Sequence, residues 1–155
     1  MFPRPHYEEI NAPNLNKILA TLPTKGLLHV SPRKLTYLNI DDNYIHQIFP
    51  LIPNPQANKP DYFGEGEMGA HISIIYPEEN NVAANNELNK EHAFSVQGFF
   101  TAIINQKRYY ILRVHAPSLL EVRKRQQLPE YPYFKDFSVD LHITVGVQLL
   151  DIDTV

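Results

Sequence analysis

The sequence contains no cysteine, and this absence removes several kinds of chemistry at once. Without thiols the chain can form no disulfide bond, bind no metal through thiolates and use no cysteine nucleophile. No stretch approaches the roughly 20 consecutive apolar residues that cross a bilayer. The N-terminal sequence MFPRPHYEEINAPNL has prolines and charges where a secretory signal would carry its apolar run. We therefore expect a cytoplasmic protein that does not associate with membranes.

A general excess of positive charge is also missing. The chain has 14 Lys and Arg against 17 Asp and Glu, which gives a formal net charge of −3. A long nucleic-acid duplex is held by many basic residues, so we do not expect one as a partner, whereas a small nucleotide or an RNA end can be bound locally. A length of 155 residues with 43% apolar residues is typical of one compact domain. We expect a monomer with a single domain over residues 1–155.

What the sequence does contain is a strand-like segment with an unusual polar face, LHITVGV at 141–147. Side chains of an extended chain alternate between two faces, so His142, Thr144 and Gly146 share the face opposite Leu141. An acid/base group and a hydroxyl lie there side by side, and the glycine leaves room for a ligand to approach. This face has the composition of a binding or catalytic site.

The segment AHISIIYP repeats this chemistry 71 residues earlier, with His71 and Ser73 on one face. A single polar pair on the outer face of a half-buried strand is common, but a second copy favours a functional site. By strict alternation Tyr76 points to the opposite face and is expected in the core, unless the strand ends at Pro77 and turns it.

The two halves of the chain repeat one order of elements. Each half is expected to contain a strand or hairpin, a helix, a loop and then a histidine strand. The aromatic pair Tyr62-Phe63 precedes His71 by the same spacing as Tyr133-Phe134 precedes His142, which also indicates an internal duplication. The expected elements are a strand over 34–40, a helix over 41–52 and a loop over 50–69, then a hairpin over 93–105 and 108–115, a helix over 116–128 and a loop over 126–140.

The two motifs, HISI and HITV, resemble the His-apolar-[Ser/Thr]-apolar signatures of the 2H phosphoesterases, which include RNA 2′-5′ ligase-like proteins and cyclic phosphodiesterases. The resemblance covers residues 34–148 and leaves residues 1–33 as an N-terminal extension. It implies an α+β, bilobal fold in which two pseudo-twofold-related antiparallel sheets carry helices on the outside and flank a central cleft. A third match, His29-Val30-Ser31, is followed by Pro32, which tends to end a strand, and we interpret it as a chance match.

The two motifs suit phosphodiester cleavage by general acid and base. His71 and His142 can fill these roles because an imidazole with a pKa of about 6.5 can be neutral or protonated at working pH. Ser73 and Thr144, on the same faces, can donate hydrogen bonds to phosphate oxygens, whose charge must be stabilised in the transition state. Neither motif lies in the G-x-S-x-G turn of a serine hydrolase.

A metal site is the alternative chemistry for histidines. Catalytic zinc usually has three protein ligands, and two distant histidines do not supply them. His46, His92 and His115 can complete a set only in space, because they show no ligand spacing. We predict no metal and no cofactor.

The predicted function is a metal-independent phosphodiesterase that hydrolyses a 2′,3′-cyclic phosphate or a 2′-5′ bond of a small nucleotide or RNA end. The resemblance also allows ligation, the reverse reaction. The alternative is a non-catalytic module that binds a nucleotide or RNA end in the same cleft.

Substrate selection needs groups beyond the motifs. Tyr62, Phe63, Tyr133 and Phe134 can stack on a base, although such rings equally often anchor loops to the core. The run Arg123-Lys124-Arg125 can bind phosphate, but consecutive helical residues spread over a wide arc, and a solvated face is favoured.

Overall fold

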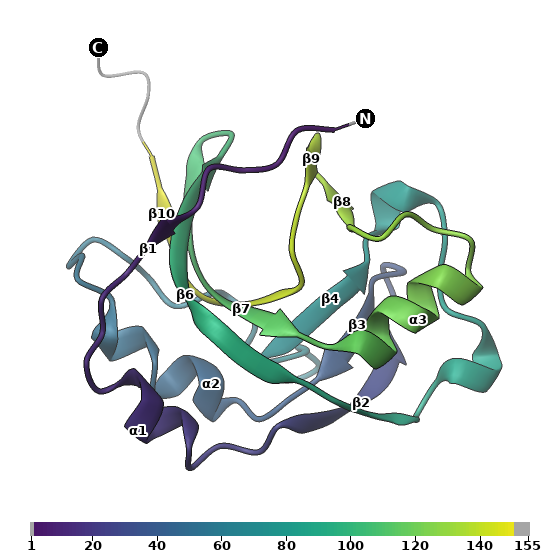
Figure 1. Cartoon of the computed structure of the whole chain (residues 1–155), viewed down its shortest axis with the longest axis horizontal. Helices are drawn as coiled ribbons and strands as arrows, with labels where there is room; N and C mark the ends of the chain where they lie inside the picture. Colours follow the sequence, from purple (N-terminus) through teal and green to yellow (C-terminus); the bar gives the residue numbers. More distant parts are fainter. Residues whose placement is uncertain (1, 151–155) are drawn as a thin grey trace.

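The computed structural model describes residues 2–150, and eight of its strands form one antiparallel sheet (Figure 1). The motif strands β10 and β4 lie at its centre, next to each other. From one edge to the other the strands are β1 (Glu8–Glu9), β6 (Ser95–Ile104), β7 (Lys107–His115), β10 (His142–Leu149), β4 (His71–Ile75), β3 (Thr36–Asn39), β2 (Lys25–Val30) and β5 (Glu91–Ala93).

The sequence predicted two separate sheets, whereas the structure joins both halves in one. The cause is the pairing of β4 with β10, in which Ile72 and Ile143 are opposite each other. Both isoleucines are fully buried in the same core, so the two halves share one apolar layer instead of packing as separate lobes. The predicted hairpin is confirmed as β6 and β7, which a two-residue turn at 105–106 connects.

A second, two-stranded sheet lies where the sequence predicted only a loop. Its strands are β8 (Tyr133–Phe134) and β9 (Phe137–Ser138), and Phe134 pairs with Phe137 across the turn. The turn residues Lys135 and Asp136 both have positive φ, 48° and 72°. Two such residues in a two-residue loop give the twist that suits a tight hairpin.

Short helices cover one face of the large sheet. Helix α2 packs on β10, and α3 packs on β4, so each helix covers the motif strand of the other half. The predicted helix over 116–128 is confirmed as α3, with a proline in its first turn, while that over 41–52 is divided into α2 and a 3₁₀ turn, η1. The helices are α1 (Leu15–Leu19), α2 (Asn43–His46) and α3 (Pro117–Arg125), and the 3₁₀ turns are η1 (Phe49–Leu51), η2 (Pro77–Glu79) and η3 (Asn85–Glu87).

Within residues 2–150 the longest helix, α3, has nine residues, far fewer than the roughly 20 that a membrane-spanning helix requires.

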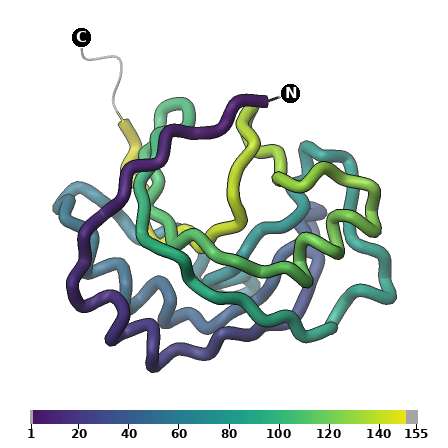
Figure 2. The backbone as a smooth tube through the Cα atoms, in the orientation of Figure 1, coloured from purple at the N-terminus to yellow at the C-terminus, as the bar shows by residue number. Residues whose placement is uncertain are grey.

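Residues 2–33, set outside the core by the sequence, contribute two strands to the sheet in the structure. Strand β1 pairs with β6, and β2 lies between β3 and β5. Before β1 the chain runs alongside the segment that carries β9, as both views show (Figures 1 and 2). There the Ser138 amide donates a hydrogen bond to the Pro3 carbonyl at 2.8 Å. We name residues 2–9 the N-terminal strap.

Each motif strand contains a β-bulge directly after its motif. Between β3 and β4 the register passes from Tyr37 opposite Ser73 to Thr36 opposite Ile75, which leaves Ile74 without a partner. Between β7 and β10 it passes over Val145 in the same way. An extra residue interrupts the alternation of side chains, so residues beyond the bulge exchange faces.

The bulges overturn two predictions that relied on strict alternation. Gly146 was placed beside Thr144, but a Cβ on Gly146 would lie 2.3 Å from Cδ1 of Ile52, a residue packed against the helix-covered core. Tyr76 was expected in that core unless the strand ended near Pro77 and turned it, and β4 does end at Ile75. Tyr76 belongs instead to a second cluster on the opposite face, where its ring lies 4.8 Å from that of Phe134.

Candidate active site

The four predicted motif side chains come together on the face that the helices leave uncovered. Continuing the Ile72–Ile143 register by one residue in each direction places His71 opposite Thr144 and His142 opposite Ser73. On one face of an antiparallel pair, opposite Cβ atoms are about 4.5–5.5 Å apart and diagonal neighbours about 7–8 Å. The two histidines therefore form one diagonal of a square of residues, and the two hydroxyls form the other.

Both imidazole rings are held by the same kind of hydrogen bond. Nδ1 of His71 lies 2.8 Å from the carbonyl oxygen of Gly69, and Nδ1 of His142 lies 2.7 Å from that of Asp140. A carbonyl oxygen can only accept, so each Nδ1 carries a hydrogen and donates it. In the neutral ring this leaves Nε2 unprotonated and able to accept a proton.

Burial lowers the pKa of both histidines below the ordinary value. His71 is only 8% exposed, and its pKa is lowered first by loss of solvent and further by His142, while the bond to Gly69 opposes this shift. The pKa of His142 is also lowered by burial, against opposing contributions from the Asp140 carbonyl and carboxylate. Both rings are consequently neutral at pH 7 in the unliganded protein. A bound phosphate would favour the protonated form of either ring, because opposite charges stabilise each other.

Tyrosines surround the first motif. The ring of Tyr62 meets the ring of His71 edge-on at 4.7 Å, and the ring of Tyr37 also meets it edge-on, at 5.6 Å. Burial raises the pKa of Tyr62 to about 12. Burial also raises the pKa of Tyr76, an effect that the nearby Ser73 hydroxyl partly offsets. These phenols stay protonated at neutral pH and can donate hydrogen bonds.

Of the four predicted stacking residues, Tyr62 and Phe134 border this face, since Phe134 packs on Tyr76. Phe63 lies elsewhere, with its ring 4.6 Å from that of His46 on α2. The ring of Tyr133 is stacked on Phe2 of the N-terminal strap at 4.0 Å.

The N-terminal strap holds the residue that orients His142. The Asp140 carboxylate pairs with Arg4 of the strap and lies 3.1 Å from Nε of Arg113. The Asp140 amide donates a hydrogen bond to the Tyr7 hydroxyl at 3.3 Å. The sequence did not reveal Arg4 and Tyr7, because they belong to the segment set outside the core. It did not reveal Asp140 and Arg113 either, because their contact joins a loop to β7.

His29, interpreted as a chance match, lies two strands from the motif residues. It is opposite Tyr37, its ring is 5.9 Å from that of Tyr37, and β2 ends at Val30, just before Ser31 and Pro32. Tyr37 therefore separates His29 from His71. The remaining histidines do not assemble, and among residues 2–150 no group of three or more His, Asp or Glu side chains is placed to hold a metal ion.

In the basic run on α3, Lys124 and Arg125 are exposed, as the predicted solvated face requires, but Arg123 is not. Arg123 is fully buried, where it donates hydrogen bonds to the Ile74 carbonyl at 2.7 Å and to both carboxylate oxygens of Glu79 at 2.9 and 3.0 Å. Arg125 pairs with the buried Glu87. These arginines hold α3 against neighbouring segments, and Arg123 also fixes β4 at its bulge.

Comparison with protein families finds one matching model, described as Swiss Army Knife, 2H phosphoesterase domain, over residues 36–152. No curated protein and no solved structure matches significantly. The matched region includes both motif strands, the hairpin β6–β7 and helix α3. The chain therefore belongs to the 2H phosphoesterase family.

Proposed function

We propose that the protein is a metal-independent phosphodiesterase that hydrolyses a 2′,3′-cyclic phosphate or a 2′-5′ bond of a small nucleotide or RNA end. One observation carries the proposal. His71 and His142 lie diagonally on one face, and each has Nδ1 committed to a backbone carbonyl, which leaves both Nε2 atoms for substrate. Family membership supports phosphodiesterase-type activity.

In the proposed reaction a neutral histidine removes a proton from water while the water oxygen bonds to phosphorus. The second histidine, protonated when the phosphate binds, gives its proton to the ribose oxygen as the bond between that oxygen and phosphorus breaks. The two rings end with exchanged protonation states, so proton exchange with solvent restores the enzyme. Ser73 and Thr144 donate hydrogen bonds to the nonbridging oxygens, where negative charge increases.

The proposal includes a pseudo-twofold relation between the halves and a central substrate cleft along β4 and β10. A constant offset of 71 residues supports the relation. It connects the two histidines, their carbonyl partners Gly69 and Asp140, and the bulged residues Ile74 and Val145. We place Tyr62 and Phe134 at the edge of this cleft as contacts for the base or ribose.

The test is turnover of a panel of 2′,3′-cyclic nucleotides and 2′-5′ dinucleotides, with product identified by chromatography. Product should accumulate well beyond one equivalent of protein. Ser73→Ala and Thr144→Val should each lower turnover about 10- to 1,000-fold, as loss of one donor to a developing charge does. Ser95→Ala, an exposed serine at the start of β6, is the matched control and should change nothing.

The second candidate is a binding module that uses the same face without chemistry. The contacts of Tyr37 and Tyr62 with His71 favour this candidate, because aromatic rings beside a polar group can bind a nucleotide without any reaction taking place. It predicts stoichiometric binding of a nucleotide and no product. That result across the whole panel would refute hydrolysis.

A further inference from the structure

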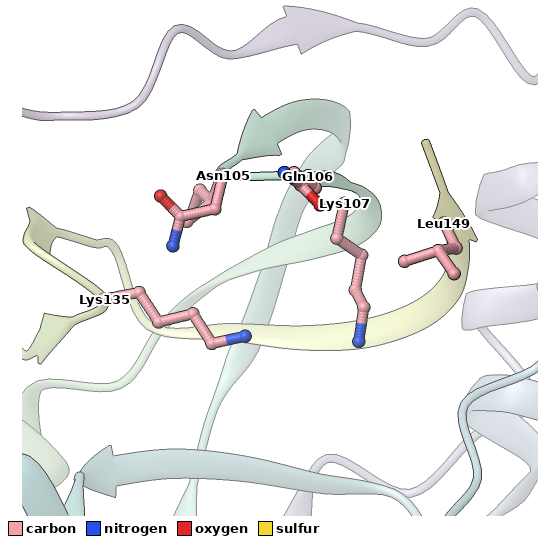
Figure 3. A pocket seen from close by; sticks show the side chains of 6 residues that line it. Asn105, Gln106, Lys107, Lys135 and Leu149 are labelled. Atoms are coloured by element: carbon pink, nitrogen blue, oxygen red, sulfur yellow. The ribbon is translucent and has the colours of Figure 1, made fainter. Parts of the chain in front are cut away.

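Two hairpin turns meet beside the active-site face and form a hollow of about 630 Å³ (Figure 3). One is the β6–β7 turn, and the other is the β8–β9 turn with Lys135 at its tip. Small-molecule sites commonly have volumes of about 300–1,000 Å³. The hollow is lined by Ile104, Asn105, Gln106, Lys107, Lys135 and Leu149.

The hollow carries concentrated positive charge in a chain whose net charge is −3. Lys107 and Lys135 direct their ammonium groups into it from different hairpins (Figure 3). Within residues 2–150 neither lysine takes part in an ion pair. Among the described residues that line the hollow none is acidic, although the Glu78 carboxylate accepts a hydrogen bond from the Lys135 amide at 3.0 Å. Two ammonium groups that converge in a hollow with such a lining attract an anion.

The backbone at Lys135 adds a second observation. Its φ of 48° lies in the left-handed region, which Gly, Asn and Asp adopt far more readily than Lys. The tight hairpin itself requires a positive φ at this position, but a glycine, asparagine or aspartate would meet that requirement at a lower conformational cost than lysine. Residues in costly conformations cluster at ligand sites, and here the lysine at the turn supplies a cation at the rim of the hollow.

Aromatic side chains connect the hollow to the candidate active site. Nζ of Lys135 lies 3.4 Å from the Tyr109 hydroxyl, and the Tyr109 ring meets Phe134 edge-on at 6.0 Å. Phe134 in turn packs on Tyr76, which lies beside Ser73. A ligand held at Ser73 can therefore extend along these rings to the two lysines.

We propose that the hollow binds a second phosphate of the substrate, so that the preferred substrate is a nucleotide with a phosphate in addition to the one attacked. This inference rests on the proposed function for the first phosphate. Lys107 and Lys135 would bind the second one as point charges, and the amides of Asn105 and Gln106 supply further donors at the same rim.

The test is isothermal titration with unreactive ligand pairs, the 3′,5′-bisphosphate and the 3′-monophosphate of each common nucleoside. The wild type should prefer the bisphosphate about 5- to 30-fold, a range suited to two partly solvated charge contacts, and the preference should weaken with salt. Lys107→Met/Lys135→Met should abolish the preference and leave the monophosphate affinity unchanged. The control Lys17→Met/Lys124→Met removes two exposed helical lysines and the same total charge, and should keep the preference.

The proposal is overturned if the wild type shows no preference, or if the Lys107→Met/Lys135→Met variant retains it. Inorganic pyrophosphate alone is a further arm. If its binding depends on the two lysines while the nucleotide preference does not, the hollow is a separate anion site and the proposal is wrong. If no cyclic phosphate or 2′-5′ bond is turned over but the lysine-dependent preference remains, the hydrolysis proposal fails and the second-phosphate site stands.

Discussion

Gly146→Ala should destabilise the protein by about 1–3 kcal/mol, the usual cost of adding a methyl group to a filled core. The added Cβ would lie 2.3 Å from Cδ1 of Ile52, whereas ordinary contacts begin near 3.4 Å, so one of the two must move by about 1 Å. Phe49 at 3.5 Å and the Asn58 carbonyl at 3.6 Å limit that movement. Because the end of the Ile52 side chain is flexible, we expect the lower half of the range.

Urea denaturation of Gly146→Ala, Ile52→Val and the double variant measures this contact directly. Ile52→Val removes the Cδ1 that the new methyl group meets. The double variant should therefore be about 0.5–2 kcal/mol more stable than the sum of the single effects predicts. Nucleotide affinity should stay constant, since Gly146 faces the helices. If Gly146→Ala keeps full stability but loses affinity, Gly146 lies beside Thr144 and the assignment of faces after the bulge is wrong.

Contacts on both faces of the sheet can be tested by substitution. Arg123→Met should lower the free energy of unfolding, measured by urea denaturation, by about 3–5 kcal/mol, because it leaves the buried Glu79 carboxylate without its cationic partner. A loss below about 1 kcal/mol would contradict a stabilising role for the Arg123–Glu79 pair. The unliganded protein should lose stability as pH falls below about 6.5, because the histidines of the unfolded chain take up protons, whereas His71 and His142 in the folded protein have lowered pKa values and do not. The His71→Gln/His142→Gln variant should show a weaker dependence of stability on pH. An unchanged slope would contradict the lowered pKa values of the two histidines. Arg4→Met should lower kcat about 3- to 10-fold through looser positioning of Asp140, with KM unchanged. The change in stability should stay under about 1 kcal/mol because Arg4 is 40% exposed. An unchanged kcat would show that Arg113 alone suffices to position Asp140.

Local patterns were sufficient to identify the motif strands and the elements around them. Alternation in HISI and HITV predicted which side chains share a face as far as Ser73 and Thr144, and the apolar spacing predicted the hairpin and α3. These features depend on residues close together in the chain. The family model over residues 36–152 confirms the resemblance that the motifs indicated.

The remaining features depend on partners that are distant in the chain. The bulges at Ile74 and Val145 are defined by the neighbouring strands β3 and β7, so no signal within the motif strand reveals them. Arg123 is buried because Glu79 and the Ile74 carbonyl, more than 40 residues earlier, satisfy its donors. Likewise the contact of Arg4 with Asp140 spans 136 residues. Because these partners are so distant in the chain, no structural role for Arg123 or Arg4 could be predicted from the sequence.

The central claim is that His71 and His142 act together as acid and base on one phosphate. Its most direct test is the turnover rate of His71→Ala, His142→Ala and the double variant with the best substrate of the panel, each variant being checked for folding by circular dichroism. Each single variant should lose about two to four orders of magnitude, and the double variant should lose little more than either, because the two rings act in one step. A folded double variant that keeps near-normal turnover would contradict the claim.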